Sequence, residues 1–257
     1  MNLELDQKCL LVTGASRGIG RAIAESLLHE GAHVGLVARG QLQLDQTVDE
    51  LRQQYGVKRV VGWSTDCADE VALLELRQQI TQRWKGLDGV IANVGDGKSV
   101  PDAIPEAEQW SKVWQTNFET ALNTARVFLP LLQESKGNIL FISSIAGLEA
   151  IGAPVDYSTA KTAVIAFAKN LARKVAPEVR VNVIAPGNVH FTGSSWEEKI
   201  KTNPKKIEQM LQDKVPMKRF GTPEEIADAA TFLCSARASF ITGSVMVVDG
   251  GQTVSLL

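Results

Sequence analysis

Short apolar runs alternate with longer amphipathic segments along almost the whole chain of 257 residues. The first apolar run, residues 10–13, leads through a turn into the helical run RAIAESLLHEGA. Further runs that are typical of buried strands lie at residues 33–38, 59–65, 89–92, 138–143, 179–184 and 244–248. Strands that alternate with helices predict an α/β fold, a doubly wound parallel sheet with helices on both faces and right-handed connections.

The chain is long enough to bury one large core. Hydrophobic residues make up 44% of it, and no linker-like segment interrupts the alternation of elements. Proteins of the α/β class with about this length commonly form one domain. We therefore expect residues 1–257 to fold as a single domain.

The turn after the first strand is rich in glycine. Gly14, Gly18 and Gly20 lie in the sequence TGASRGIG, directly before the first helical run. Glycine lets a backbone turn tightly and approach a ligand closely, and the free amides at a helix start favour an anion. The context of strand, glycine turn and helix predicts a site for a dinucleotide pyrophosphate, although a similar turn can also exist without a ligand.

A tyrosine and a lysine stand four residues apart at the start of another helical run. The stretch YSTAKTAVIAFAKNLARKV, residues 157–175, has no internal glycine or proline and predicts one helix. Lys161 then lies on the same face as Tyr157, and its positive charge is expected to lower the pKa of the phenol. Such a tyrosine would serve as a general acid and base, whereas the alternative is a packed ring beside a solvated charge.

Ser144 lies thirteen residues before that tyrosine. It ends the apolar run NILFISS, which predicts a buried strand, and residues at the carboxyl end of a parallel strand face the ligand crevice. Its hydroxyl is therefore expected to hold a substrate oxygen.

Together with Asn93-Val94-Gly95 after a strand, Asn117 in a mid-chain helix and Pro186-Gly187, these motifs resemble the short-chain dehydrogenase/reductase family. The resemblance follows the family's order of motifs from about residue 8 to residue 252. It implies a three-layer Rossmann-type fold. It also implies hydride transfer between a nicotinamide and a carbonyl or carbinol carbon, with protein groups moving the proton.

The resemblance assigns expected roles to individual residues. Tyr157 would exchange the proton, Ser144 would orient the substrate oxygen, Lys161 would also hold the nicotinamide ribose, and Asn117 would kink its helix and hold a water molecule. The residues expected to contact the dinucleotide are Gly14, Ser16, Arg17, Gly18, Ile19, Gly20, Arg39, Asp66, Cys67, Asn93, Gly95, Tyr157, Lys161, Pro186, Gly187 and Val189.

The charges near the second strand bear on the choice of cofactor. Family members that use NAD usually carry an acidic residue at the position of Ala38, and here no carboxylate stands there. Arg39 follows directly and Arg17 lies in the glycine turn, so two cations could approach a ribose phosphate. NADP(H) is therefore expected rather than NAD(H), unless Arg39 is a solvated loop residue and Arg17 pairs elsewhere. Asp66 would accept a bond from the adenine amino group, or it would cap a helix.

The substrate is less closely constrained. The family places a mobile substrate lid at residues 188–216, where Trp196 and Met210 offer apolar surface. With residues 95–100, they predict mainly apolar walls that suit a ketone or an acyl chain. The other expected wall residues are Ile145, Ile151 and Val155.

The general pattern is similar to 3-oxoacyl-(acyl-carrier-protein) reductases, so a 3-oxoacyl-type carbonyl is the expected substrate. The two cationic positions by which those enzymes often engage their carrier correspond to Ser135 and Glu178, although Lys136 and Arg180 lie nearby and could replace them. The alternatives are a sugar or secondary-alcohol dehydrogenase and a dinucleotide-sensing regulator without catalysis. A sugar-nucleotide epimerase fits less well, because its glycine spacing and larger carboxyl-terminal region are missing.

Composition argues against several other classes. The net charge is −2 and the basic residues are scattered, so neither nucleic acid nor an anionic membrane is an expected partner. Cys9, Cys67 and Cys234 follow no metal-ligand pattern, and reduced thiols without a bound metal are expected. The first residues lack a signal-like pattern and no apolar run has membrane-spanning length, which predicts a soluble, cytoplasmic protein.

Self-association is expected from the family resemblance. The helices predicted around residues 117–132 and 157–175 carry apolar residues on more than one side, and relatives pair these helices in dimers. The tail SVMVVDGGQTVSLL resembles a second interface of those relatives. A homotetramer is therefore expected, with a homodimer as the smaller alternative.

Overall fold

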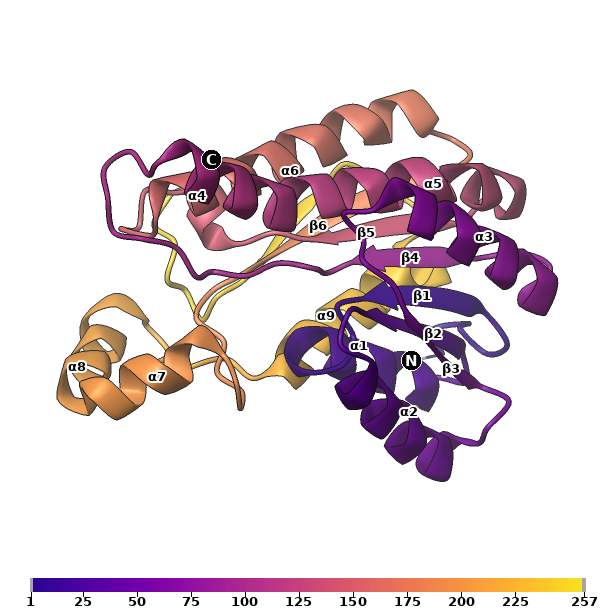
Figure 1. Cartoon of the computed structure of the whole chain (residues 1–257), viewed down its shortest axis with the longest axis horizontal. Helices are drawn as coiled ribbons and strands as arrows, with labels where there is room; N and C mark the ends of the chain where they lie inside the picture. Colours follow the sequence, from indigo (N-terminus) through magenta and orange to yellow (C-terminus); the bar gives the residue numbers. More distant parts are fainter. Residues whose placement is uncertain (1, 256–257) are drawn as a thin grey trace.

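The computed structural model describes residues 2–255, which form a parallel sheet of seven strands covered by helices (Figure 1). Neighbouring strands pair in the order β3-β2-β1-β4-β5-β6-β7. The strands are β1 (Cys9–Thr13), β2 (His33–Ala38), β3 (Val60–Ser64), β4 (Gly89–Ala92), β5 (Asn138–Ile142), β6 (Arg180–Pro186) and β7 (Val245–Val248). The predicted α/β fold is confirmed, and the predicted strand ends lie within two residues of the observed ones.

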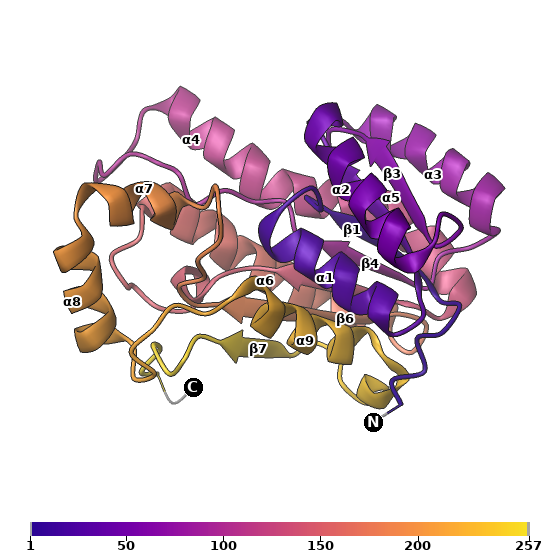
Figure 2. The ribbon, with the colours of Figure 1, turned by 90° about the horizontal axis from the view of Figure 1, so that it is seen from below.

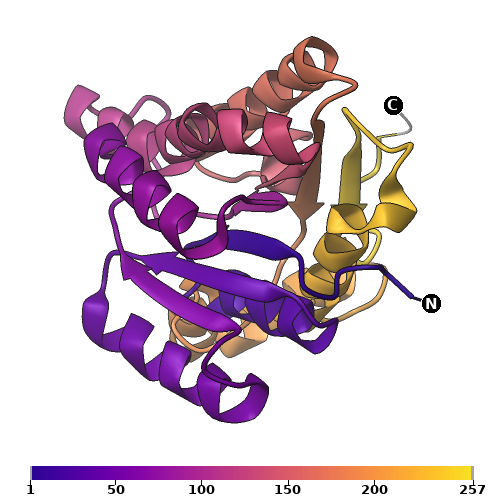
Figure 3. The same cartoon turned by 90° about the vertical axis from the view of Figure 1, so that its right-hand side faces the viewer.

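Helices cover both faces of the sheet, which gives the three layers visible in Figure 3. One face is covered by α1 (Gly18–His29), α2 (Gln41–Tyr55) and α9 (Pro223–Cys234). The other face is covered by α3 (Glu70–Trp84), α5 (Thr120–Ser135) and α6 (Val155–Val175). The apolar sides of these helices pack against fully buried strands such as β5, and a single domain results.

The strand order reverses direction at β1. Strand β1 pairs with β2 on one side and with β4 on the other, so the chain crosses the sheet between β3 and β4. The connections that leave β1 and β4 therefore diverge to opposite faces, and a crevice opens at the carboxyl ends of these two strands. The glycine turn follows β1, and Asn93 follows β4.

Two short helices stand apart from the layers. Helices α7 (Ser195–Thr202) and α8 (Pro204–Lys214) protrude at one end of the molecule in Figures 1 and 2. Neither helix contains a buried residue. They make up most of the expected lid, residues 188–216, which enters the fold directly after β6.

The mid-chain helix is interrupted. Helix α4 (Ala107–Trp114) continues into a π-helical turn, Gln115–Glu119, before α5 begins. A π-turn inserts one extra residue per turn into a helix and is frequent at functional sites. The single helix expected around Asn117 is thus two helices with a wider turn between them, and Asn117 lies in that turn.

No helix among residues 2–255 has both the length and the apolar character needed to cross a bilayer. The three cysteines are free thiols, and burial raises the pKa of Cys67 and of Cys234 to about 12. Over the same residues, no cluster of three or more histidine, cysteine or acidic side chains is arranged to bind a metal ion.

Candidate active site

Two adjoining cavities lie along the carboxyl ends of the strands. The smaller one, here the Arg39 cavity, has a volume of about 440 Å³ and is lined by the glycine turn, the end of β2 and the segment after β3. The larger one, here the Tyr157 cavity, has a volume of about 800 Å³ and is lined by Ser144, Tyr157, Lys161 and part of the 188–216 segment. Both cavities share Gly14, Arg17 and Arg39, so together they form one continuous cleft.

The glycine turn has the geometry that a pyrophosphate requires. Gly14 adopts a left-handed backbone with φ of +64°, and Gly20 packs directly against the Gly14 carbonyl and the Asn93 side chain. Asn93 Nδ2 donates to the carbonyls of Thr13 at 2.9 Å and Gly14 at 3.2 Å, which holds the turn against β4. The turn therefore leaves backbone room above the start of α1, where an anion is favoured.

The expected dinucleotide contacts all line the cleft except Gly18. Gly18 is covered instead by the ring of Phe191, which packs against it from the 188–216 segment. Arg17 Nη1 also donates to the Gly193 carbonyl at 3.3 Å. The segment thus touches the glycine turn at two adjacent points, a contact that the sequence does not reveal because the partners are more than 170 residues apart.

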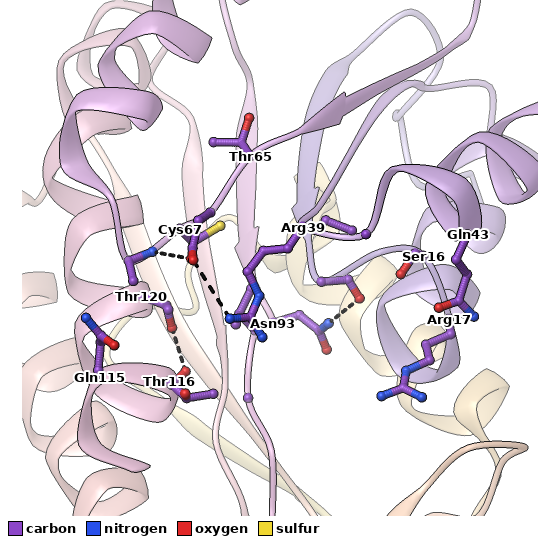
Figure 4. Close-up of a pocket in the computed structure, with 17 residues that line it drawn as sticks. Ser16, Arg17, Arg39, Gln43, Thr65, Cys67, Asn93, Gln115, Thr116 and Thr120 are labelled. Carbon is purple, nitrogen blue, oxygen red and sulfur yellow. Dashed lines mark hydrogen bonds and ion pairs between the residues drawn. The ribbon is translucent and has the colours of Figure 1, made fainter. Parts of the chain in front are cut away.

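The Arg39 cavity contains the two arginines expected to select the cofactor. Arg39 extends across the cavity toward the segment with Cys67, while Arg17 lies on the opposite side beside Ser16 and Gln43 (Figure 4). The Arg39 side chain is 70% exposed, and its guanidinium lies 3.8 Å from the Asp66 carboxylate. Asp66 also accepts a bond from the Ala68 amide at 2.9 Å, so it stabilises the turn after β3. Helix α3 is capped by a different residue, Asp69.

The proton-transfer residues meet in the Tyr157 cavity. Ser144 follows β5, and its Oγ accepts a bond from the Ala146 amide at 3.1 Å in a short 3-10 turn. Tyr157 and Lys161 lie one turn apart near the start of α6, as their spacing predicts. Ser143 Oγ donates to the Lys161 carbonyl at 2.8 Å, which fixes α6 against the end of β5.

Lys161 is held in a buried position. Its side chain is 4% exposed, Nζ donates to the Ile142 carbonyl at 3.2 Å, and Nζ lies 5.9 Å from the centre of the Tyr157 ring. Burial lowers the pKa of this ammonium to about 8. Nζ also lies so close to the backbone that a Cβ at Gly95 would approach it to 2.7 Å, which explains the glycine at that position.

The expectation that Lys161 lowers the pKa of Tyr157 is not met in this structure. The pKa of Tyr157 is raised, chiefly by burial and additionally by the Asp96 carboxylate, while a hydrogen bond with Ser144 opposes the rise. The spacing of the two residues places them side by side, but it carries no information on how deeply the phenol is buried. The tyrosine is therefore protonated over the neutral range, which is the form that can donate a proton.

Asn117 is buried in the π-turn and is 1% exposed. Its Nδ2 donates to the carbonyls of Asp96 at 3.1 Å and Val113 at 3.0 Å, and its Oδ1 accepts from the Asp96 amide at 3.0 Å. The side chain thus fixes the loop after β4 next to Lys161. The water molecule expected beside Asn117 stays a prediction.

Three of the side chains expected in an apolar substrate wall, Ile145, Ile151 and Val155, do not line either cavity. Ile145 is only 1% exposed inside the 3-10 turn, and Ile151 and Val155 are exposed but do not line either cavity. Met210 does not line the cleft either, and its sulfur instead contacts Asn188 Nδ2 at 3.6 Å. Trp196 does line the Tyr157 cavity, where its ring lies 5.3 Å from that of Phe220.

Polar side chains occupy much of the wall near the proton-transfer residues. The loop after β4 and the helix α4 contribute residues that sequence reasoning had grouped with an apolar wall or had missed. These are Asp96, Lys98, Ser99, Gln109 and Lys112. At the other end of the cleft, the residues missed are Gln43, Thr65, Gln115, Thr116 and Thr120. Gln115 and Thr116 lie in the π-turn, which the sequence pattern does not signal.

The cations proposed as substitutes for carrier contacts are not equivalent. Arg180 is half-buried, and its guanidinium donates to the carbonyls of Leu233 at 3.0 Å, Ser235 at 3.2 Å and Ile241 at 3.3 Å. Arg180 therefore ties β6 to the segment after α9 and has no free face for a carrier. Lys136 ends α5 in a left-handed conformation.

Sequence comparisons agree with this site. A family model described as enoyl-(acyl carrier protein) reductase matches residues 14–253. The chain is 34% identical over 256 residues to a 3-oxoacyl-(acyl-carrier-protein) reductase of Aquifex aeolicus, which covers 98% of this chain and 100% of that protein. The chain belongs to the short-chain dehydrogenase/reductase family.

This short-chain dehydrogenase/reductase is similar to enzymes with different substrates. It is 35% identical over 274 residues to a cyclohexanol dehydrogenase of a Rhodococcus species, which covers 99% of both chains. Its fold matches the crystal structure of L-sorbose reductase from Gluconobacter frateurii, complexed with NADPH and L-sorbose, with a TM-score of 0.93 and 30% identity over both full chains. The protein is thus an oxidoreductase of a family that acts on carbonyl and alcohol groups.

Proposed function

We propose that the protein is an NADP(H)-dependent reductase of a ketone, with the reverse oxidation of a secondary alcohol as the same reaction run backwards. The observation that carries this proposal is the continuity of the cleft, because Ser144, Tyr157 and Lys161 line the same space as the glycine turn and Arg39. A nicotinamide cofactor bound there supplies the hydride that is added to the carbonyl carbon.

The chain's own residues handle the oxygen and the proton. In the proposed reduction, the Ser144 hydroxyl binds the carbonyl oxygen, and the Tyr157 hydroxyl donates its proton to that oxygen as the carbon accepts the hydride. The raised pKa of Tyr157 keeps this donor protonated at neutral pH. Lys161 stabilises the phenolate that remains, because the two groups lie side by side in a buried setting.

The preference for NADP(H) rests on charge at the end of β2. Ala38 places no carboxylate at the end of β2, and Arg17 and Arg39 flank the Arg39 cavity from opposite sides. A guanidinium binds a phosphate through directed, charge-assisted hydrogen bonds. The relative solved with NADPH adds support from a similar fold.

The cofactor proposal is tested by comparing kcat/KM for NADPH and NADH in the wild type and in Arg39→Ala. We expect the wild type to favour NADPH by about tenfold or more and the variant to lose most of that preference. Arg83→Ala on α3, which lies outside both cavities, is the control. A wild type that favours NADH would overturn the assignment.

Two substrate types have support. A 3-oxoacyl thioester is favoured by the relative from Aquifex aeolicus, and a sugar or another small polar ketone is favoured by the L-sorbose reductase and by the polar wall. An NADPH-oxidation screen over small ketones, oxidised sugars and 3-oxoacyl thioesters, free and on carrier protein, separates them. Binding of NADPH without turnover of any carbonyl would favour a dinucleotide-sensing regulator instead.

A further inference from the structure

A carboxylate faces the reacting centre without a cationic partner. Asp96 lines the Tyr157 cavity, and it is close enough to Tyr157 to raise the pKa of the phenol. Among residues 2–255, the one group that donates to this carboxylate is the Lys98 amide, at 3.0 Å from Oδ1. The second oxygen, Oδ2, therefore has hydrogen-bonding capacity left, on a side chain that lines the Tyr157 cavity.

The backbone of Asp96 is held in place by the buried side chain of Asn117. Both backbone polar groups of Asp96 are bonded to the Asn117 side chain in the π-turn. The next residue, Gly97, lies beside the phenol, because a Cβ added there would be 3.9 Å from Tyr157 Cζ and 4.0 Å from Ser195 Oγ. The loop thus runs beside the Tyr157 ring, and Asp96, directly before Gly97, lines the same cavity.

A second anchor fixes the far end of the same loop. Ser99 Oγ donates to the buried Asp156 carboxylate at 2.5 Å, and it accepts from Gln109 Nε2 at 3.4 Å. Asp156 is the residue directly before Tyr157 and is 1% exposed. The loop is therefore tied to α4 and to the start of α6, and its polar wall is preorganised rather than mobile.

The remaining charges on this wall are donors. Lys98 and Lys112 line the Tyr157 cavity, and their ammonium groups have no hydrogen-bond or ion-pair partner within the described part of the chain. One free acceptor and two free donors suit a molecule with several hydroxyl groups, because each hydroxyl both donates and accepts. An unbranched acyl chain in the same place would desolvate these charges and leave them unpaired, which is costly.

We propose that this reductase selects a short polyhydroxylated ketone, and that Asp96 determines this selectivity by accepting a hydrogen bond from a hydroxyl group next to the reacting carbonyl. The proposal rests on the reductase function proposed above and names the substrate class of that site. Lys98 and Lys112 bind hydroxyl oxygens farther along the substrate. Asp96, Lys98 and Lys112 are exposed to solvent in the open cleft, and a ketone without hydroxyl groups would cover them without bonding to them, so deoxygenated ketones are disfavoured.

The test compares ketones that match in carbon number. Kinetic constants are measured with NADPH for dihydroxyacetone against acetone, for erythrulose against 2-butanone, and for an acetoacetyl thioester. We expect kcat/KM to be at least about tenfold higher for the hydroxylated member of each pair. If 2-butanone or the thioester is reduced as efficiently as erythrulose, the proposed selectivity is wrong while the reductase function stands.

The variant Asp96→Asn tests whether Asp96 causes the selectivity for hydroxylated ketones. Asparagine keeps an acceptor for the Lys98 amide, so the loop is retained and only the charged acceptor is lost. We expect the ratio of kcat/KM between erythrulose and 2-butanone to fall about tenfold. Any general effect on proton transfer cancels in this ratio. Asp102→Asn, an exposed residue of the same loop that lines neither cavity, should leave the ratio unchanged.

A binding measurement without turnover separates the two proposals. Calorimetry with the Tyr157→Phe protein and NADPH gives the Kd of erythrulose directly. When Asp96→Asn is added to this variant, the Kd of erythrulose should rise about tenfold, and the weak binding of 2-butanone should stay unchanged. An equal loss for both ketones would refute the role of Asp96. Preferential binding of erythrulose by a wild type that reduces no ketone would uphold this selectivity and sink the reductase function.

Discussion

Tyr157 is the residue on which the proposed chemistry depends most directly. Tyr157→Phe keeps the ring and removes only the proton, so we expect kcat to fall by about 100-fold to 10,000-fold while NADPH affinity changes little. Steady-state kinetics and titration of NADPH fluorescence measure the two quantities. The chain offers a matched control, because Tyr55 on α2 is its one other tyrosine and lies outside both cavities. A Tyr157→Phe protein with substantial activity would remove the tyrosine from its role.

The pH dependence of ketone reduction should report the charges around the same phenol. The groups that face it are Lys161 from α6, Ser144 after β5 and Asp96 after β4. Burial and the Asp96 carboxylate raise the pKa of Tyr157, and reduction needs the protonated form, so activity persists at neutral pH and is lost as pH rises through that pKa. Asp96→Asn removes one cause of the rise and should move this loss to lower pH in a pH profile of kcat. An unmoved or upward-shifted limb would contradict the electrostatic coupling, and Asp102→Asn is the reference.

The buried ammonium of Lys161 should lower the free energy of unfolding, although the proposed reaction requires it. Its pKa falls from 10.5 to about 8 on folding, so the unfolded chain holds this proton more tightly. The resulting penalty, up to about 3 kcal/mol, is fully present below pH 8 and disappears as pH rises from 8 to 10.5. Lys161→Met should therefore raise the free energy of unfolding at pH 7, less so at pH 10, and should abolish turnover.

Urea denaturation at both pH values measures this effect. Lys174→Met, at an exposed position of the same helix, should show no such pH-dependent gain. The loss of the bond to the Ile142 carbonyl offsets part of the gain for Lys161→Met. If Lys161→Met has a lower free energy of unfolding than the wild type at pH 7, burial of the charged lysine does not destabilise the fold.

At the scale of elements, the contact between the 188–216 segment and the start of α1 is the feature open to test. Gly18 has φ of +55° and lies under the Phe191 ring. Gly18→Ala should lower the free energy of unfolding by about 1–2 kcal/mol, because alanine is strained in a left-handed backbone conformation. It should also weaken NADPH binding, because the Phe191 ring must move away from the added methyl group. Thermal unfolding and fluorescence titration measure both effects. Gly86→Ala, where nothing lies within 4 Å of an added Cβ, should change neither.

Elements with a clear period and a local motif could be predicted from the sequence, and elements set by distant contacts could not. The strands before Gly14 and Ser144 and the helix with Tyr157 and Lys161 appear where the apolar pattern places them. The family resemblance implied a kink at Asn117, but its form, a π-turn, could not be predicted because α4 and α5 continue one helical pattern through it. Whether Ile151 or Asp96 lines the cleft depends on how loops pack together, and apolar character alone does not predict that Asp96 lines it while Ile151 does not.

At the scale of the whole molecule, exposed apolar side chains near β7 bear on the expected assembly. Strand β7 lies at the edge of the sheet with Val247 exposed, and Phe240 is fully exposed just before it. We expect a homotetramer with four times the chain mass of 27.8 kDa, measured by light scattering after size-exclusion chromatography. Val247→Asp should reduce this mass, whereas Val71→Asp on the outer side of α3 should not. A monomeric wild type would overturn the expectation.

The cleft is assembled from separate stretches of chain. Its end with Arg17 and Arg39 comes mainly from residues 14–68, whereas the end with Asp96 and Tyr157 comes from residues 95–117, 142–161 and 186–196. Substitutions that alter the end with Arg17 and Arg39 therefore fall mainly in a different part of the chain from those that alter the end with Asp96 and Tyr157. In a recombined gene, the first 68 codons could be exchanged for those of a relative with another cofactor while the polar side chains around Asp96 stayed in place.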